Sequence, residues 1–174
     1  KGVARKHGYG ATFMAKPYAD KSGNGFHVHF SLIDSDGNNV FDDGTDAGSE
    51  LLRHAIAGLM ETMADSMLIF APHLNSYRRF AAGAHAPTFA SWGYENRTVA
   101  LRVPESEPVA RRIEHRVSGA DANPYLVLAS VLAGALYGIE NKLQPPSAIE
   151  GDAYAEAEER DLPRLPTRWD DATL

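Results

Sequence analysis

The sequence predicts an α+β fold in which short, largely antiparallel strands are backed by two long helices. The helices are predicted by apolar residues that recur at helical spacing in 49–70 and 123–139. The strands are predicted by extended runs at 11–16, 25–31, 96–104 and 111–117. A length of 174 residues suits one domain with a sizeable core.

Composition excludes several classes of protein. The net charge of -6 argues against nucleic-acid binding as the main activity. No apolar run reaches the length of a membrane span and no secretory signal is present, so we expect a cytoplasmic protein with no membrane or nucleic-acid partner. The absence of cysteine excludes disulfides, zinc-thiolate sites and thiol nucleophiles. Because the chain begins at Lys1 rather than at a methionine, we expect a fragment.

The run 25–31 contains two histidines two residues apart. Side chains alternate along a strand, so His27, His29 and Ser31 share one face while phenylalanine and valine take the other. Two imidazoles and a hydroxyl on one face can hold a metal ion and a phosphate group. The alternative is that the histidines face solvent on an amphipathic strand. The glycine-rich loop 20–25 before them either lets the backbone approach a ligand or is simply flexible.

The remaining elements follow from local signals. The run 11–16 is expected to end as a strand at Pro17, and 34–39 predicts a hairpin turn before a return strand at 40–41. Ser49 is a plausible N-cap for a core-facing helix that stops before Pro72. Asn123 and a following proline open the second helix, which is apolar nearly all round and is expected to be buried. From 144 onward the chain is predicted to be a surface connection.

Charged residues gather in two of the predicted strands. Segment 96–104 carries Arg97 and Arg102 near its ends. In 111–117, alternation places Arg112, Glu114 and Arg116 on one face. A carboxylate flanked by guanidiniums can hold a metal ion while the arginines bind phosphate or carboxylate groups. The alternative is a charged outer face on an edge strand.

Taken in order, these segments resemble the C-terminal catalytic portion of the glutamine synthetase family. The matching motifs are Lys16-Pro17, Gly23 to Ser31, Asn75-Ser76-Tyr77-Arg78-Arg79, Asn96-Arg97, Leu101-Arg102-Val103-Pro104, Arg112-Ile113-Glu114-His115-Arg116 and Asn123-Pro124-Tyr125. The resemblance implies that residues 1–174 are the C-terminal part of the catalytic domain, forming a curved part of the family's barrel. The N-terminal β-grasp domain and the first half of the catalytic domain would then be absent.

The resemblance also implies roles for individual residues. His27 and Glu114 would bind Mg²⁺ or Mn²⁺. The residues expected to contact ATP or the phosphoryl group in transit are His29, Ser31, Arg97, Arg102 and Arg112, with Arg97 as the catalytic residue. The residues expected to bind glutamate are Gly23, Arg79 and Arg116. These side chains suit phosphoryl transfer, which depends mainly on positioning and charge neutralisation.

The activity implied is a ligase of nitrogen metabolism that joins glutamate to an amine through γ-glutamyl phosphate, at the expense of ATP. The wording of several motifs is most similar to the γ-glutamylpolyamine (γ-glutamylputrescine) synthetase branch. His85 stands where ammonia-using enzymes carry a loop glutamate, and Val109 replaces a lysine. An ammonia-using glutamine synthetase and a non-catalytic structural or binding relative remain alternatives. The full-length protein is expected to form a homo-oligomeric ring with active sites between subunits, and the fragment alone to be inactive.

Overall fold

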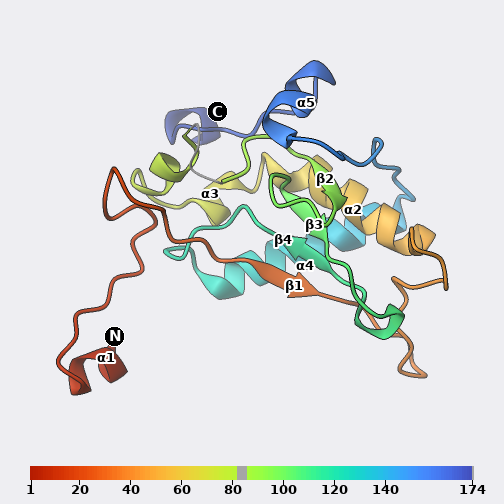
Figure 1. Ribbon diagram of the computed structural model, residues 1–174, viewed down its shortest axis with the longest axis horizontal. Coiled ribbons are helices and arrows are strands. Elements are labelled where there is room, and N and C mark those ends of the chain that lie inside the picture. Colours follow the sequence, from red (N-terminus) through yellow and green to blue (C-terminus); the bar gives the residue numbers. More distant parts are fainter. Residues whose placement is uncertain (82–85, 174) are drawn as a thin grey trace.

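The computed structural model describes residues 1–81 and 86–173 and has the predicted α+β architecture (Figure 1). Its strands are β1 (Val28–Phe30), β2 (Trp92–Tyr94), β3 (Leu101–Val103) and β4 (Ile113–His115). Its α-helices are α1 (Gly2–Lys6), α2 (Glu50–Met63), α3 (Met67–Phe70), α4 (Pro124–Glu140) and α5 (Ala153–Glu159). Short 3-10 helices lie at η1 (Ser76–Arg79), η2 (Pro108–Ala110) and η3 (Asp170–Thr173).

The strands form one open sheet in the order β1-β4-β3-β2. The pairs β1–β4 and β4–β3 are antiparallel and β3–β2 is parallel, so the expectation of a largely antiparallel sheet is confirmed. The register places His29 and Arg102 opposite Glu114, one on each side. Residues directly opposite in neighbouring strands share a face. The backbone pairing alone therefore brings the two charged runs and the histidine run together.

The other face of the sheet packs on the helices. Val28, Leu101 and Ile113 belong to the same buried cluster as Leu52 and Ile56 of α2. The alternation predicted for 25–31 is confirmed, since Val28 is buried and His27 and His29 are exposed. A smaller apolar cluster joins α5 to the segment before β3.

Two predicted strands are wrong. Residues 11–16 form no strand in the described structure, because both backbone groups of Lys16 bond to the side-chain amide of Asn75, at 2.8 and 2.9 Å. The return strand at 40–41 is reduced to one bridge between Ile33 and Asn39 beside the turn. At Lys16, one side chain thus satisfies backbone groups that a neighbouring strand would otherwise bind. Conversely, strand β2 was not predicted.

The helix predicted over 49–70 is split. Ser49 caps α2 as predicted, accepting a hydrogen bond from the Leu52 amide at 3.2 Å. The helix ends at Met63, and α3 begins again at Met67. Between them Ser66 has a non-helical ψ of 1° and its hydroxyl accepts a hydrogen bond from Ser130 of α4 at 2.9 Å. The break thus coincides with a polar contact between the two helical layers.

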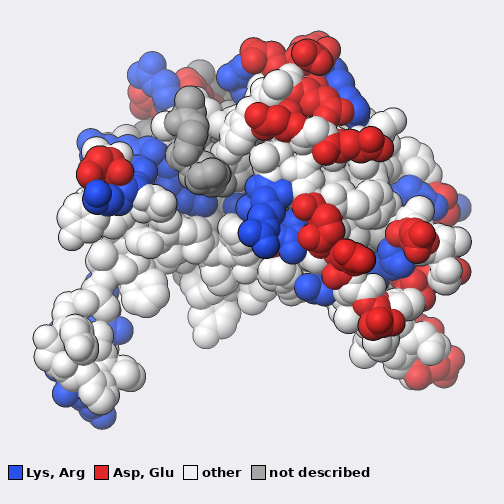
Figure 2. Space-filling view, viewed as in Figure 1, with Lys and Arg blue, Asp and Glu red and all other residues white. Residues whose placement is uncertain are grey.

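The expectation that α4 is fully buried is wrong. Asn123 caps it as predicted and one side packs on α2, but the opposite side carries exposed apolar residues. These are Tyr125, Leu126, Leu128, Leu132, Leu136 and Tyr137, between 43% and 81% exposed. Uncharged atoms cover the lower edge of the molecule where α4 begins (Figures 1 and 2). Only one side of α4 has a packing partner within 1–81 and 86–173. None of the helices described is long and apolar enough to cross a membrane.

Candidate active site

Glu114, in the middle of β4, is the centre of a cluster of charged side chains. It is 3% exposed. Its Oε1 lies 2.9 Å from Nδ1 of His27 and 3.0 Å from Nη1 of Arg116, and its Oε2 lies 3.2 Å from Nη1 of Arg102. The predicted shared face of Glu114 and Arg116 is therefore confirmed. A buried carboxylate that is paired with two guanidiniums is held in one position, where it can also bind a further cation or a metal ion.

The cluster extends outward through His29 and Arg112. Nε of Arg112 donates a hydrogen bond to Nδ1 of His29 at 3.3 Å. Nε2 of the same ring lies 3.5 Å from Glu114 Oε1. The two imidazoles and two of the predicted arginines thus converge on one carboxylate, and Arg112 is joined to them through His29.

An open groove of about 520 Å³ adjoins this cluster. It is lined by Arg102 and Arg112 together with Glu95, Pro104, Glu105, Ser106, Glu107 and Pro108. Figure 2 shows basic and acidic side chains next to each other in the middle of the face in view. Two of the residues predicted to contact ATP therefore border a space that can accept a ligand.

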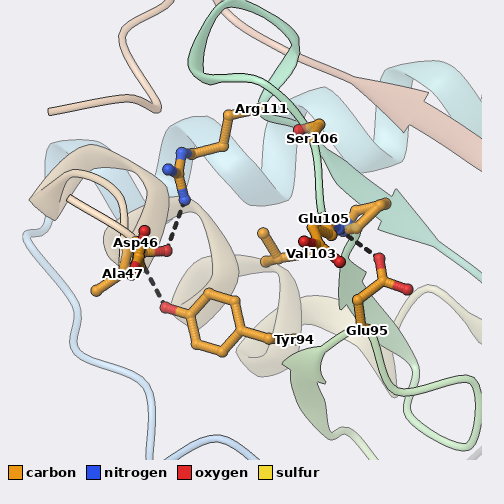
Figure 3. Close-up of a pocket in the computed structure, with 9 residues that line it drawn as sticks. Asp46, Ala47, Tyr94, Glu95, Val103, Glu105, Ser106 and Arg111 are labelled. Atoms are coloured by element: carbon orange, nitrogen blue, oxygen red, sulfur yellow. Dashed lines mark hydrogen bonds between the residues drawn. The ribbon is translucent and has the colours of Figure 1, made fainter. Parts of the chain in front are cut away.

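A second cavity, of about 550 Å³, lies beside the first (Figure 3). Its walls include Tyr94, whose hydroxyl donates to the Ala47 carbonyl at 2.8 Å, and Arg111, which donates to the Asp46 carbonyl at 2.8 Å. None of the residues predicted to bind ligands lines it. Of the two spaces, only the groove at Arg102 and Arg112 is bordered by residues predicted to bind ligands.

The electrostatics of the cluster keep Glu114 ionised. Burial by itself would raise the pKa of Glu114, but the positive charges of Arg116 and Arg102 hold it below its ordinary value. The ion pairs of Glu114 are therefore fully formed at neutral pH and are lost only as the pH falls through this lowered pKa. Burial and the nearby Arg116 lower the pKa of His27, which favours the neutral imidazole that can ligate a metal ion.

Arg79 forms a second part of the site. It is 5% exposed and its Nη1 donates to the Val117 carbonyl at 3.1 Å. The side chain passes over two glycines so closely that a Cβ at Gly23 would lie 2.9 Å from Cγ, and a Cβ at Gly25 would lie 3.3 Å from Nη2. The same Cβ at Gly25 would lie 3.2 Å from Nε2 of His27. The structure thus brings Arg79, Gly23 and His27 together.

Other predicted residues are less closely connected. Arg97 is exposed, and only its carbonyl meets the cluster, accepting from Nη2 of Arg116 at 2.9 Å. Ser31 is exposed just after β1. Val109 on η2 is 79% exposed. His85 lies outside the described residues. The binding roles expected of Arg97 and Ser31, like those of the other predicted site residues, remain predictions.

The donors present fit part of a metal site. Neutral imidazole and carboxylate oxygen are suitable ligands for Mg²⁺ or Mn²⁺, and Oε2 of Glu114 is buried with Arg102 Nη1 at 3.2 Å but no aligned hydrogen bond among the described residues. Within 1–81 and 86–173, however, no three His, Cys, Asp or Glu side chains are grouped to hold an ion. His27 and Glu114 could therefore supply only some of the ligands that such an ion requires.

His115 shows how the two faces of β4 differ. It is 1% exposed, packs 4.6 Å from the ring of Phe70, and has no hydrogen-bond partner among the described residues. Burial lowers its pKa to about 3. Because a histidine in the unfolded chain has a pKa of about 6.5, the unfolded chain binds one more proton than the folded one between about pH 3 and this pKa.

We expect stability to fall as the pH drops below the unfolded value, and His115→Phe to remove this contribution. The loss is at most about 1.4 kcal/mol per pH unit for one proton. Denaturant unfolding at about pH 7.5 and about pH 5 measures it, and the variant should lose less stability between the two than the wild type. Equal losses in both proteins would refute the assignment.

Comparison with known proteins decides the family. The protein-family model described as glutamine synthetase, catalytic domain, matches residues 1–174 of the sequence. The chain belongs to the glutamine synthetase family. The resemblance seen in the sequence motifs is thereby confirmed.

Several relatives are similar over nearly the whole chain. γ-Glutamylputrescine synthetase PuuA of Escherichia coli is 47% identical over 170 residues, covering 98% of this chain and 35% of that protein. γ-Glutamylethanolamide synthetase GlnA4 of Streptomyces coelicolor is 40% identical over 181 residues, covering 100% and 38%. A glutamine synthetase of Thermococcus kodakarensis is 42% identical over 170 residues, covering 95% and 38%. The chain therefore spans 35–38% of the length of these relatives.

A solved structure gives the same result for the fold. A GmaS/ADP complex superposes with a TM-score of 0.87 at 35% identity, covering 99% of this chain and 41% of that chain. The glutamine synthetase fold predicted from the motifs is confirmed.

Proposed function

We propose that the protein carrying this chain is an ATP-dependent ligase that joins the γ-carboxylate of glutamate to an amine, with a polyamine such as putrescine as the amine. The observation that carries the proposal is the Glu114-centred cluster, in which His27, Arg102 and Arg116 lie within 3.2 Å of one buried carboxylate. A chain that only served as a structural subunit would have no need to bury these charges. The names of PuuA and GlnA4 support an amine as acceptor.

The side chains described suit the first chemical step. In that step a γ-carboxylate oxygen of glutamate attacks the terminal phosphorus of ATP, and ADP leaves. Arg102 and Arg112 border the groove and would neutralise phosphate oxygens, while Arg79 would hold the α-carboxylate of glutamate. His27 and Glu114 would hold Mg²⁺ or Mn²⁺, which when bound neutralises phosphate charge.

In the second step the amine nitrogen attacks the acyl carbon and phosphate leaves. The residues that recognise the amine and the remaining metal ligands would come from outside this chain. In this proposal the complete site lies between subunits of a homo-oligomeric ring. The 174 residues alone are then expected to be inactive.

Two other functions are distinguishable by experiment. An ammonia-using glutamine synthetase is favoured by relatives such as the enzyme from Thermococcus kodakarensis, which is 42% identical. A non-catalytic relative would retain the fold without turnover.

We expect full-length protein to release phosphate from ATP faster with putrescine than with ammonium. The assay supplies glutamate, ATP and Mg²⁺ and compares putrescine, ethanolamine, isopropylamine and ammonium at equal concentration. Product mass identifies the amide, and omission of glutamate is the control. Equal or faster turnover with ammonium would exclude the polyamine specificity. Absence of turnover with every amine would favour the non-catalytic alternative.

A further inference from the structure

Arg79 is a buried cation whose direct contacts do not neutralise it. Its Nη1 donates to a neutral carbonyl, that of Val117, at 3.1 Å. Burial lowers the pKa of Arg79, and the negative charge of Asp121 opposes this change. A charge taken out of water is costly unless an opposite charge lies near it. Asp121 is therefore the carboxylate that supplies an opposite charge for Arg79.

Asp121 and Arg79 approach the same glycine. A Cβ at Gly119 would lie 2.5 Å from Oδ1 of Asp121 and 3.3 Å from Nη1 of Arg79. The two atoms are thus separated by about 6 Å at most, within the range in which an opposite charge stabilises an ionised group. No direct ion pair within 4.0 Å joins these two described side chains. Oδ1 is buried and has no hydrogen-bond partner among the described residues.

Ser76 ties Asp121 to the element that carries Arg79. The Ser76 hydroxyl is fully buried and donates to Oδ2 of Asp121 at 2.7 Å, and it accepts a hydrogen bond from the His73 amide at 3.1 Å. Ser76 and Arg79 are the first and last residues of η1. One carboxylate oxygen therefore holds this helical turn, while the other lies near the guanidinium beside Gly119.

We propose that Asp121, held by Ser76, positions the Arg79 guanidinium to bind the substrate carboxylate. Nη1 is occupied by the protein, whereas Nη2 is directed toward Gly25 and the His27 ring. Asp121 is a positioning residue, because it acts through Arg79 and does not itself touch the substrate. This role rests on the proposed function, in which Arg79 binds glutamate.

The test is steady-state kinetics of the full-length enzyme with glutamate and ATP varied in turn. Asp121→Asn keeps the size of the side chain and an oxygen for Ser76, but it removes the charge. We expect the KM for glutamate to rise about tenfold or more while the KM for ATP changes less than about twofold. Asp65→Asn makes the same change at an exposed position between α2 and α3 and should alter neither constant.

The outcomes separate the two proposals. A wild-type enzyme without glutamate-dependent phosphate release overturns the proposed function and this role with it. An active wild type with an unchanged KM for glutamate in Asp121→Asn overturns the positioning role alone, as does an equal rise in both constants. Ser76→Ala frees the carboxylate but keeps its charge, and should raise the KM for glutamate by a smaller factor. If Asp121→Asn does not fold, an unchanged KM for glutamate in Ser76→Ala overturns the role.

Discussion

Glu114→Ala is expected to lower metal-dependent phosphate release by about 10²–10³-fold or more in the full-length protein. The substitution removes a proposed metal ligand and also leaves Arg102 and Arg116 facing each other without the carboxylate that now lies 3.2 and 3.0 Å away. Without this counter-ion the buried Arg116 and the partly buried Arg102 repel each other and lose their positions. His27→Ala, which removes the imidazole that lies 2.9 Å from Glu114, should also lower metal-dependent phosphate release.

The matched control is Glu158→Gln, which lies outside the cluster and the groove. Glu158 pairs with Arg164 at 2.8 Å, and its side chain is 69% exposed. Its loss should change the rate far less, because surface ion pairs contribute little. Glu114→Gln preserves the size of the side chain and separates loss of charge from loss of packing. A Glu114→Gln enzyme with nearly wild-type turnover would refute the role of the carboxylate.

Gly138→Ala is expected to destabilise the packing of α4 on α2 strongly. A Cβ at Gly138 would lie 2.0 Å from the His54 carbonyl oxygen and 2.6 Å from the Gly58 nitrogen, both backbone atoms. Neither can move aside without separating the helices. Overpacking typically costs about 1–3 kcal/mol, and we expect the upper part of this range or more. Denaturant unfolding followed by circular dichroism measures the change.

Gly134→Ala is the control on the same helix. Its Cβ would meet the hydroxyl oxygen of Thr62 at 2.5 Å, an atom that rotation of the side chain can move, and its next neighbour lies at 3.4 Å. The better helix propensity of alanine offsets part of the cost, by about 1 kcal/mol. The two substitutions should therefore differ clearly. Equal losses of stability would mean that the helices are not held at this close contact.

The chemistry of one face of the sheet could be predicted from the sequence because alternation along a strand is a local property. The spacing of His27 and His29, and of Glu114 and Arg116, fixed which side chains share a face. The register that places His29 opposite Glu114 was not predictable, since it depends on pairing between segments far apart in the sequence.

Other features depend on contacts that no local pattern reveals. The polar link from Ser76 to Asp121 spans 45 residues, and the clamp of Asn75 on Lys16 spans 59. The only sequence signal for Asp121 is an acidic residue in the glycine-containing turn after the last strand. The burial of α4 was overestimated because its composition shows that it is apolar, but not how many of its sides have partners.

Mn²⁺ binding by the full-length protein, measured by electron paramagnetic resonance of the free ion during titration, tests the central claim most directly. We expect the Glu114→Gln variant to bind at least one Mn²⁺ per chain about tenfold or more weakly than the wild type, and Glu158→Gln to bind as the wild type does. Glu114→Gln binding with wild-type number and affinity would contradict a metal and phosphate site centred on Glu114.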